Sequence, residues 1–575
     1  MPATSELDRV TAVVLQYMRA PFLVLLATYA LGITGMSLMP GMDVGNGASR
    51  MNLFHSFYFF TFTATTTGFG EVPVDFSEPQ RLWATVCIYT GVVAWLYAIG
   101  SFIRLVQHPE LVTAVSERRF ARQVRGISQP FVVICGFGDT GSLLARGLSD
   151  NYRKAAVIDI DEERIKALRL RDYRVKMFGH CGDASVPRHL LDAGITRENC
   201  QGLVALTRSD DTNLKIAVMA RSLNPGLKIV CRSTCNQTRE YMEAVGDVEV
   251  VDPYDVFSRQ MCTAIFNPPL YNWMQRLFGA HDFNLEVFVS PPVGKWILCG
   301  FGRMGRALRE ALTERGIPTV IVDPEGDSID PQLPVVIGRA DTRALDEAGI
   351  EDAVGVVAGT DSDEDNLGIL LSARKLKADA FLVVRQNHHE NELAFNAVNA
   401  NLIMQPSLVT ARQILQMLTV PTILDLRQYL RDEGLSEVPR LVARTHGILG
   451  REKIHLWIEK LNGPGCAVSS MSEEGMAPTL GDIQRMPMDR KRRLKLLALV
   501  LQRGDELMML PEDDTKLLKD DQILFCGTES DHRLLGANLY NEYTLHYIQH
   551  GTEAPRTLFA AWLGKRSFLQ TRKLE

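Results

Sequence analysis

The sequence predicts a membrane α-helical domain with two spans, followed by two α/β domains of the Rossmann type. No charged residue occurs from Ala20 to Met42 or from Leu82 to Ile103. Each stretch can cross a hydrocarbon core of roughly 30 Å as a helix that rises about 1.5 Å per residue. A glycine-rich loop follows an apolar strand twice in the rest of the chain, after residues 135 and 299. The 575 residues are 46% hydrophobic and 23% charged, so most of the chain is expected outside the membrane.

A Thr- and Gly-rich segment lies between the two spans. Non-helical backbone at membrane depth is tolerated only where protein buries it or where it lines an aqueous cavity. The run Thr66-Thr67-Gly68-Phe69-Gly70 resembles the Thr-Val-Gly-Tyr-Gly selectivity filter of potassium channels. In that family, rings of backbone carbonyls replace the water shell of the permeant K⁺ ion. The resemblance implies that the first four carbonyls of this run face a pore axis. Because one chain supplies one such loop, it also implies a homotetramer.

The residues around this run support a pore but leave its selectivity open. Residues 52–63 (NLFHSFYFFTFT) are apolar and aromatic, too short to span a bilayer, and suited to a re-entrant pore helix. Thr67 and Phe69 replace the Val and Tyr of the usual signature, so a less selective cation channel remains an alternative. Glu71 and the nearby Asp75 and Glu78 would lie at the outer mouth, either concentrating cations or forming ordinary solvated surface.

Basic residues flank the two spans unevenly. Arg9 and Arg19 precede the first span and Arg104 follows the second, whereas the intervening loop has only Arg50 and Arg81. The positive-inside rule therefore predicts that both termini are cytoplasmic. The resemblance implies a prokaryotic inner membrane.

The membrane part is predicted to comprise an interfacial helix (residues 1–19), a pore domain (20–106) and a linker (107–129). Within the pore domain, we expect spans over 20–42 and 82–106, with the pore helix and filter over 52–71. Gly91 lies in the middle of the second span and would allow the bend of a gating hinge. Gly100 offers the same freedom, and either glycine could instead serve close helix packing.

A dinucleotide-binding pattern begins after Pro130. The apolar strand Phe131 to Cys135 is followed by Gly136-Phe137-Gly138-Asp139-Thr140-Gly141, a helix and a second strand that ends at Asp159. Glycines at this spacing, with an acid about 20 residues later, bring a phosphate to a helix N-terminus and a carboxylate to a ribose.

The same order recurs in the second half of the chain. The run Gly300-Phe301-Gly302-Arg303-Met304-Gly305 and the acid Asp323 lie 164 residues after their counterparts (300 − 136 and 323 − 159). Further along, Asn213 matches Asn366 at an offset of 153, so the second copy is 11 residues shorter (164 − 153). A repeat of this length with ordered matches indicates domain duplication.

These matches also resemble a known family. The segments Gly182-Asp183-Ala184 and Asp211-Thr212-Asn213-Leu214, with Arg339-Ala340-Asp341 and Asp365-Asn366-Leu367 in the second copy, resemble the RCK family, regulators of K⁺ conductance. Residues 496–527 look like the small α+β C-terminal lobe of that family. With the filter, the chain is similar to prokaryotic two-span potassium channels with tandem RCK domains of the multi-ligand-gated type.

The resemblance implies boundaries and an assembly. The first RCK domain would cover 130–293, the second with its lobe 294–545, and a basic tail 546–575. Crossovers are expected around Pro268-Pro269 and Pro421, where proline ends one helix and begins the next. Four chains would form a gating ring of eight RCK domains, and ligand binding there would bend the second span through the linker.

The resemblance further implies NAD or an adenine nucleotide as the regulatory ligand. The implied nucleotide-site residues are Gly136, Gly138, Gly141, Asp159 and Asp183 in the first copy, and Gly300, Gly302, Gly305, Asp323 and Asp341 in the second. Arg303 can pair with a phosphate, and Arg232 and Arg385, which each end a strand, are further candidates. An alternative is that one copy is an empty Rossmann fold.

A dense acidic run follows a strand of the second copy. Asp361, Asp363, Glu364 and Asp365 could bind Ca²⁺, which prefers several carboxylate oxygens. Acids at the start of a helix also cap it and suit its dipole, so both roles stay open.

Composition and motifs exclude several other classes. The net charge of −6 gives no indication of nucleic-acid binding. Ten scattered cysteines without a zinc-like pair suggest buried, reduced thiols. A dehydrogenase would leave the spans unexplained, and a K⁺ transport regulator that senses NAD(H) would lack them. We therefore predict a non-enzymatic, ligand-gated channel in the lipid bilayer that conducts K⁺ passively and needs no obligatory protein partner.

Overall fold

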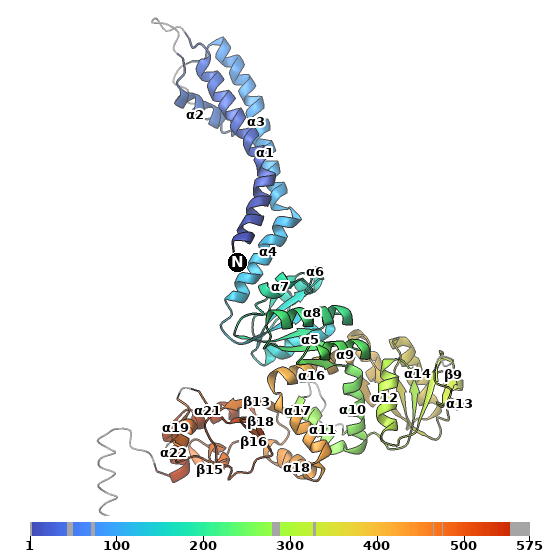
Figure 1. The fold of residues 1–575 in the computed structure, drawn as a ribbon. Coiled ribbons are helices and arrows are strands. Elements are labelled where there is room, and N and C mark those ends of the chain that lie inside the picture. Colours follow the sequence, from blue (N-terminus) through green and yellow to red (C-terminus); the bar gives the residue numbers. More distant parts are fainter. Residues whose placement is uncertain are drawn as a thin grey trace, which may run out of the picture. The chain divides into compact units, whose positions relative to one another are not determined.

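The computed structural model describes residues 3–42, 50–70, 75–278, 288–325, 329–463, 465–473 and 475–552 (Figure 1). The chain divides into two compact units. The membrane unit comprises residues 1–128 with 192–194, and the α/β unit comprises the remainder. Glu71 and the tail beyond residue 552, both of which carried sequence-based predictions, lie outside the described residues.

The membrane unit contains four helices in its described part. They are α1 (Ala3–Leu38), α2 (Leu53–Ala64), α3 (Glu78–Val106) and α4 (Pro109–Arg125). The segments Val14–Leu38 and Glu78–Val106 are long and apolar enough to cross a membrane. The expected interfacial helix over residues 1–19 is continuous with the first span. Pro21 removes only one backbone hydrogen bond, which is not enough to end a helix of 36 residues.

Glycines on α1 allow α2 and α3 to approach it closely. Phe60 of α2 is fully buried, and a Cβ atom added at Gly32 of α1 would lie 2.3 Å from its ring. A Cβ at Gly35 would lie 2.2 Å from the Trp83 ring of α3. The Trp83 indole N–H donates a hydrogen bond to the Gly32 carbonyl over 3.1 Å. Glycine therefore sets how closely these helices pack.

The first half of the α/β unit is a six-stranded parallel sheet in the order β3-β2-β1-β4-β5-β6. The strands are β1 (Phe131–Cys135), β2 (Lys154–Asp159), β3 (Phe178–Cys181), β4 (Cys200–Ala205), β5 (Lys228–Arg232) and β6 (Val248–Val251). The helices are α5 (Asp139–Asp150), α6 (Glu162–Leu170), α7 (Pro187–Asp192), α8 (Asp210–Leu223), α9 (Asn236–Ala244), α10 (Pro253–Phe266) and α11 (Pro268–Phe278). The strand order reverses at β1, and ligands bind at such a point in doubly wound folds.

The second half repeats this topology, with the order β12-β11-β10-β7-β8-β9. Its strands are β7 (Lys295–Cys299), β8 (Thr319–Asp323), β9 (Val335–Ile337), β10 (Ala353–Ala358), β11 (Phe381–Arg385) and β12 (Leu402–Met404). Its helices are α12 (Arg303–Thr313), α13 (Thr342–Glu347), α14 (Asp363–Leu376), α15 (Glu392–Ala397), α16 (Pro406–Thr419), α17 (Thr422–Asp432) and α18 (Val438–Leu449). The predicted duplication is confirmed, and the helix breaks fall at Pro268 and Pro421 as expected.

The two repeats exchange their crossover helices. Helix α10 of the first repeat packs on α12 of the second, with Met261 and Leu308 in one buried core (Figure 1). Helix α16 of the second repeat packs on α5 of the first, with Ile414 and Leu148 in another. The crossover helix that follows each repeat therefore covers the first helix of the other repeat.

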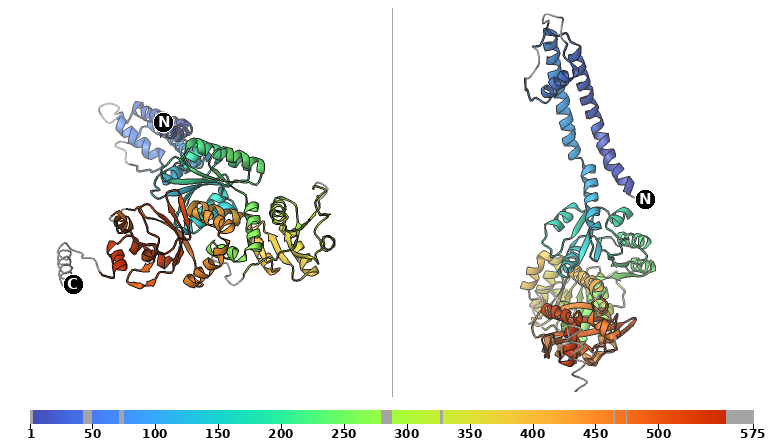
Figure 2. Two further views of the ribbon diagram at one scale, coloured as in Figure 1. Left: turned by 60° about the horizontal axis from the view of Figure 1, so that its bottom comes forward. Right: turned by 90° about the vertical axis from the view of Figure 1, so that its left-hand side faces the viewer.

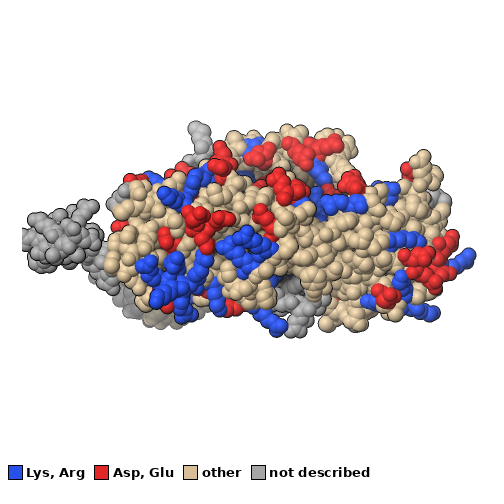
Figure 3. Space-filling view, turned by 90° about the horizontal axis from the view of Figure 1, so that it is seen from below, with Lys and Arg blue, Asp and Glu red and all other residues tan. Residues whose placement is uncertain are grey.

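A separate lobe completes the α/β unit (Figure 2). Strands β13 (His455–Lys460), β16 (Leu496–Arg503), β17 (Glu506–Met509) and β18 (Gln522–Gly527) form an antiparallel sheet in the order β13-β18-β16-β17. Helices α19 (Ala467–Glu473), α20 (Leu480–Ile483), α21 (Glu529–Leu539) and α22 (Glu542–His550) and the hairpin β14–β15 (Arg485–Met486, Asp489–Arg493) complete it. The lobe begins upstream of the predicted residue 496. On the face shown in Figure 3, acidic and basic side chains are interspersed.

Candidate functional site

The filter segment has an alternating backbone. Thr66, Gly68 and Gly70 have φ angles of +57°, +64° and +69°, so every second residue is left-handed. In an extended strand, successive carbonyls point to opposite sides, whereas alternation of left- and right-handed residues brings them to the same side. This is the arrangement that a row of carbonyl ligands requires. Gly68 and Gly70 adopt it without steric cost, whereas Thr66 adopts it as a strained residue.

The end of α2 anchors this segment. The Phe62 carbonyl accepts hydrogen bonds from the backbone N–H groups of Thr67 (2.9 Å) and Gly68 (3.3 Å). The hydroxyls of Thr65 and Thr67 lie 2.8 Å apart. Phe69 is 71% exposed in the single chain. The filter backbone is thus held by the predicted pore helix.

Gly91 contacts the pore helix rather than open space. A Cβ added at Gly91 would lie 3.0 Å from the Ala64 Cβ and 3.2 Å from the Ala64 Cα. Helix α3 passes through Gly91 without a break. At Gly100, an added Cβ would have no neighbour within 4 Å. Close packing therefore accounts for glycine at position 91, and a hinge there stays a prediction.

The three glycines of the first loop have different roles. Gly136 has a φ angle of +102°, and an added Cβ would lie 2.8 Å from the Leu206 carbonyl. A Cβ at Gly141 would lie 2.2 Å from the Gly136 carbonyl, so Gly141 allows α5 to pack against the loop. At Gly138, the nearest atom would be an Arg164 nitrogen at 3.7 Å. Gly138 is therefore the position where a ligand can approach the backbone.

Asp159 holds the loop in place. Its carboxylate, which is nearly fully buried, accepts hydrogen bonds from the backbone N–H groups of Phe137 (2.5 Å) and Asp161 (2.8 Å). The Arg164 guanidinium lies 3.5 Å from the same carboxylate. The role that the sequence assigns to Asp159, binding a ribose hydroxyl, would have to share these oxygens.

A cavity of about 820 Å³ opens beside this loop. Its wall includes the predicted residues Gly136, Gly138, Asp159, Asp183 and Arg232. Asp183 is exposed and accepts a hydrogen bond from the Ser185 N–H over 2.8 Å. Gly141, by contrast, is not part of the wall and acts behind the loop.

The cavity also contains residues that the sequence analysis missed. Four further cations line it, and Ser407 enters it from α16 of the second repeat. Among the cations, Arg171 donates a hydrogen bond to the Ser142 hydroxyl of α5 over 2.6 Å. The four cations are Arg164, Arg171, Arg208 and Lys215. Cations around a glycine loop suit a phosphorylated ligand.

The second loop repeats this geometry. Gly300 has a φ angle of +90°, and a Cβ at Gly305 would lie 2.2 Å from the Gly300 carbonyl. At Gly302, an added Cβ would have no neighbour within 4 Å. The Asp323 carboxylate accepts hydrogen bonds from the N–H groups of Phe301 (2.6 Å) and Glu325 (2.8 Å). Asp341 caps α13 by accepting a hydrogen bond from Ala344 over 2.9 Å.

The matched asparagines make equivalent contacts. Asn213 is fully buried; it bonds the backbone N–H and carbonyl of Thr207 and donates to the Arg232 carbonyl over 3.0 Å. Asn366 is likewise buried, bonds Thr360 in the same way and donates to the Arg385 carbonyl over 2.9 Å. Each asparagine therefore fixes the strand end from which an arginine projects.

The side chains of the acidic run differ in burial. Asp363 is buried, and its carboxylate accepts hydrogen bonds from the backbone N–H groups of Asn387 (2.7 Å) and His388 (2.9 Å) and from the Asn391 side chain (2.8 Å). The side chains of Asp361, Glu364 and Asp365 are exposed. The Asp363 oxygens are thus engaged by the protein itself, and the Ca²⁺ site stays a prediction.

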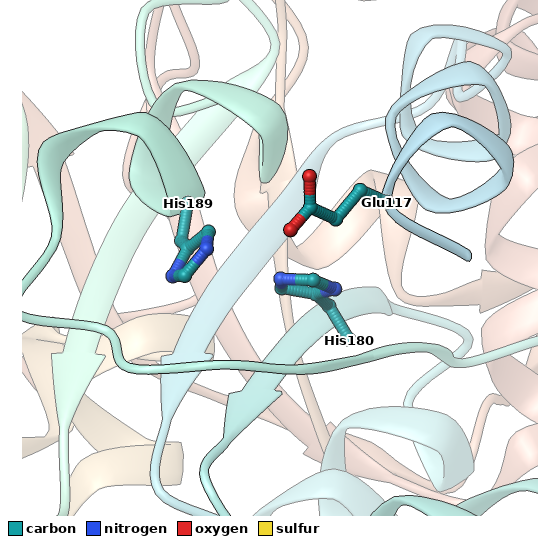
Figure 4. Close-up of side chains that lie close together, drawn as sticks. All are labelled: Glu117, His180 and His189. Carbon is teal, nitrogen blue, oxygen red and sulfur yellow. The ribbon is translucent and has the colours of Figure 1, made fainter. Parts of the chain in front are cut away.

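The cysteines and one histidine pair complete the chemistry of the α/β unit. Among the thiols predicted to be buried, Cys135, Cys299 and Cys526 are fully enclosed, whereas Cys235 is exposed. The rings of His180 (β3) and His189 (α7) lie 4.8 Å apart, centroid to centroid (Figure 4).

Different families of known proteins match the membrane unit and the α/β unit. The ion channel family model matches residues 21–108, and the TrkA-N domain model matches residues 132–253 and 296–406. The probable potassium channel protein 2 of Methanocaldococcus jannaschii is 26% identical over 252 residues, which are 44% of this chain and 68% of that protein. Potassium channel protein 1 of the same organism is 24% identical over 237 residues, 41% of this chain and 69% of that protein.

Two further similarities cover different parts of the chain. The Trk system potassium uptake protein TrkA homolog of Pyrococcus horikoshii is 27% identical over 223 residues, 38% of this chain and 94% of that protein. The solved structure of the GsuK channel bound to NAD is 16% identical with a TM-score of 0.46, over 92% of this chain and 100% of that one.

The family matches agree with the fold described above. The ion channel match covers most of the two membrane-capable helices and the short helix α2 between them, and each TrkA-N match covers one six-stranded parallel sheet. The predicted fold class and the predicted family of domains are therefore confirmed: the chain carries an ion channel domain followed by two TrkA-N, or RCK, domains.

Proposed function

We propose that this protein is a ligand-gated potassium channel that conducts K⁺ passively. The observation that carries the proposal is the alternating left-handed backbone at Thr66, Gly68 and Gly70, held by the short helix α2 between two membrane-capable helices. Two of the relatives described above are named as potassium channels, which supports K⁺ as the permeant ion.

The assembly follows from the exposure of the filter. Residues 65–70 are exposed in the single chain, although an apolar Phe69 side chain in a pore loop needs protein neighbours. A homotetramer around a central axis would supply them and would form a ring of eight RCK domains. In this arrangement both termini and the α/β unit are cytoplasmic, at a prokaryotic inner membrane.

Gating is assigned to nucleotide binding in the α/β unit. The cavity of about 820 Å³ beside the first glycine loop combines open backbone at Gly138 with several cations, which suits NAD or ADP. A neighbour of similar fold is described as bound to NAD and another as bound to ADP, which supports this ligand class. No catalytic step is part of the proposal.

The permeation proposal is tested with purified full-length protein in planar bilayers. Bi-ionic K⁺/Na⁺ reversal potentials should show selectivity for K⁺, and Gly68→Ala should abolish the current because a Cβ strains the backbone at a φ angle of +64°. Gly226→Ala, at a glycine with open space and no positive φ, is the control and should conduct normally. A reversal potential near zero would instead favour the less selective cation channel.

The gating proposal is tested by adding NAD⁺, ADP and Ca²⁺ in turn to the side of the bilayer that faces the α/β unit. Nucleotide should change the open probability, and Arg232→Gln, which removes a cation from the cavity wall, should weaken this response about tenfold. A Ca²⁺ response that is present in the wild type and lost in Asp361→Asn would support a Ca²⁺ site in the acidic run. Indifference to every nucleotide would contradict the gating proposal and leave the pore proposal intact.

A further inference from the structure

The second glycine loop is bordered by the first repeat. Arg303, the first residue of α12, donates a hydrogen bond from Nη1 to the Thr234 hydroxyl over 2.5 Å. Thr234 follows β5 of the first repeat and donates in turn to the Asp210 carboxylate, from its N–H over 2.9 Å and from its hydroxyl over 3.3 Å. The guanidinium of Arg303, which directly follows Gly302 of the second loop, is therefore tied to the other repeat.

Tyr254, also from the first repeat, supports two arginines at this place. It lies in the first turn of α10 and is 3% exposed. The guanidinium carbon of Arg303 lies 5.4 Å from its ring centroid, and that of Arg385 lies 5.3 Å from it. Cation–π contacts of this kind hold a guanidinium without neutralising its charge.

Nearby acids balance the charge of this arginine pair only in part. Within the described ranges, neither Arg303 nor Arg385 forms an ion pair, and the Arg385 Nε atom is buried without a hydrogen-bond partner. Burial and the neighbouring Arg303 lower the pKa of Arg385, against the opposing effects of Tyr254 and nearby acids. Of these acids, Asp363 is already engaged with N–H donors. Arg303 and Arg385 therefore retain positive charge with which they can bind an anion.

In the first repeat, the equivalent residues line a cavity. At the offset of 153, Arg385 corresponds to Arg232 and Tyr254 to Ser407. Both Arg232 and Ser407 line the cavity beside the first glycine loop. An arginine at this strand end therefore faces the glycine loop in the first repeat, where the crossover helix of the other repeat completes the wall.

We propose that Arg303 and Arg385 bind a phosphate group of a nucleotide at the second glycine loop, and that this phosphate replaces the Thr234 hydroxyl as the partner of Arg303. The proposal rests on the proposed function, because it assumes that the α/β unit binds nucleotide. It adds a consequence: occupation of the second site breaks a hydrogen bond that joins the two repeats.

Competition of this kind fixes the direction of a mutational effect. In the empty site, the Arg303–Thr234 bond must be given up when the phosphate binds, which weakens the apparent affinity. Removal of the hydroxyl should therefore strengthen binding, whereas removal of either guanidinium should weaken it. A merely structural role of Thr234 would not raise the affinity.

The experiment is isothermal titration of full-length protein with ADP and with NAD⁺. Arg303→Gln and Arg385→Gln should each weaken one class of sites at least tenfold, as expected for loss of a charged hydrogen bond. Thr234→Val should tighten the same class about threefold to tenfold, and Thr234→Ser, which keeps the hydroxyl, should leave it unchanged. Adenosine and inorganic phosphate are titrated separately, because the proposal requires the phosphate group for binding.

The outcomes separate this proposal from the one it rests on. If no nucleotide binds to the wild type, the assignment of nucleotide gating fails first. If nucleotide binds but Arg303→Gln leaves every affinity unchanged, or Thr234→Val weakens binding, the phosphate site between the repeats is overturned. Thermal unfolding of each variant identifies misfolding, and Thr234→Val tests the competition independently of the arginine variants.

Discussion

At the scale of single residues, the two repeats reuse the same polar contacts. Asn213 and Asn366 make matching hydrogen bonds, and Asp159 and Asp323 each hold their own glycine loop. The sequence identified all four residues as matches between the copies. It assigned the two acids to ribose binding, because the spacing of a motif does not reveal which backbone N–H groups a carboxylate will meet after folding.

Replacement of Asn366 by alanine should destabilise the α/β unit by about 2–4 kcal/mol, because it leaves buried backbone groups of Thr360 and Arg385 without partners. Chemical unfolding followed by circular dichroism measures the loss. Asn151→Ala, which removes one side-chain hydrogen bond to the Gly147 carbonyl at a partly exposed helix end, is the matched control and should cost less than about 1 kcal/mol. Equal losses in both variants would contradict the role of the buried amide.

His180 should make the stability of the α/β unit sensitive to acid. Burial lowers its pKa to about 4, with smaller contributions from His189, Arg169 and Arg188. Since the unfolded chain protonates near pH 6.5, stability is complete above that pH and falls progressively towards pH 4. Between pH 7 and pH 5 we expect a loss of about 2 kcal/mol through this residue, estimated from 1.36 kcal/mol per pKa unit.

The measurement compares urea unfolding at pH 7 and pH 5 for the wild type and for His180→Gln. The variant cannot take up this proton, so its stability should change less between the two pH values, whatever its absolute stability. The same pH dependence in both proteins would show that other groups cause the acid sensitivity.

At the scale of helices and strands, the local sequence pattern predicted some features, whereas others depend on tertiary contacts. The charge-free runs predicted both spans, and the proline positions predicted the breaks after α10 and α16. The pattern did not predict the continuity of α1 from Ala3, because the polar start of that helix resembles an interfacial helix. Nor did it separate a hinge from a packing glycine at Gly91, since that depends on the approach of Ala64 from another helix.

Gly91→Ala should disturb the pore by pushing α3 and α2 apart. The added methyl group would lie 3.0 Å from the Ala64 Cβ, which is closer than a normal contact between two carbon atoms. We expect at least a tenfold loss of macroscopic current at equal protein content, since overpacking costs about 1–3 kcal/mol. Gly447→Ala, at a helical glycine with open space in α18, controls for helix propensity and should conduct normally. A wild-type current in Gly91→Ala would contradict the close-packing role of Gly91.

At the scale of the whole α/β unit, duplication was visible in the sequence and the exchange of crossover helices was not. Matched offsets show that a crossover follows each repeat, but not whether it packs on its own repeat or on the other. That choice depends on contacts between residues far apart in the chain, such as Ile414 with Leu148 and Met261 with Leu308.

A charge placed in one crossover helix should therefore loosen the opposite repeat. Ile414→Asp lies in the second repeat but is expected to raise amide hydrogen exchange in β1 and α5 of the first, because an unpaired buried carboxylate costs several kcal/mol. Met261→Asp should do the reverse and raise exchange in β7 and α12. Hydrogen exchange with mass spectrometry resolves both segments. If hydrogen exchange rises only in the mutated repeat, the result would contradict the packing of each crossover helix on the opposite repeat.

The exchanged crossover helices also affect how such a protein can diversify. In a dimer of identical domains, every substitution appears in both ligand sites, so the two sites cannot become different. Here a covalent tether keeps the two partners at high effective concentration, and each site is encoded separately. Asp139 and Ser407 at the first loop correspond to Arg303 and Tyr254 at the second, and these differences carry no penalty of mispairing between chains. With the two ligand sites proposed above, the arrangement would let one polypeptide combine two unlike chemical inputs, as a two-input logic element does.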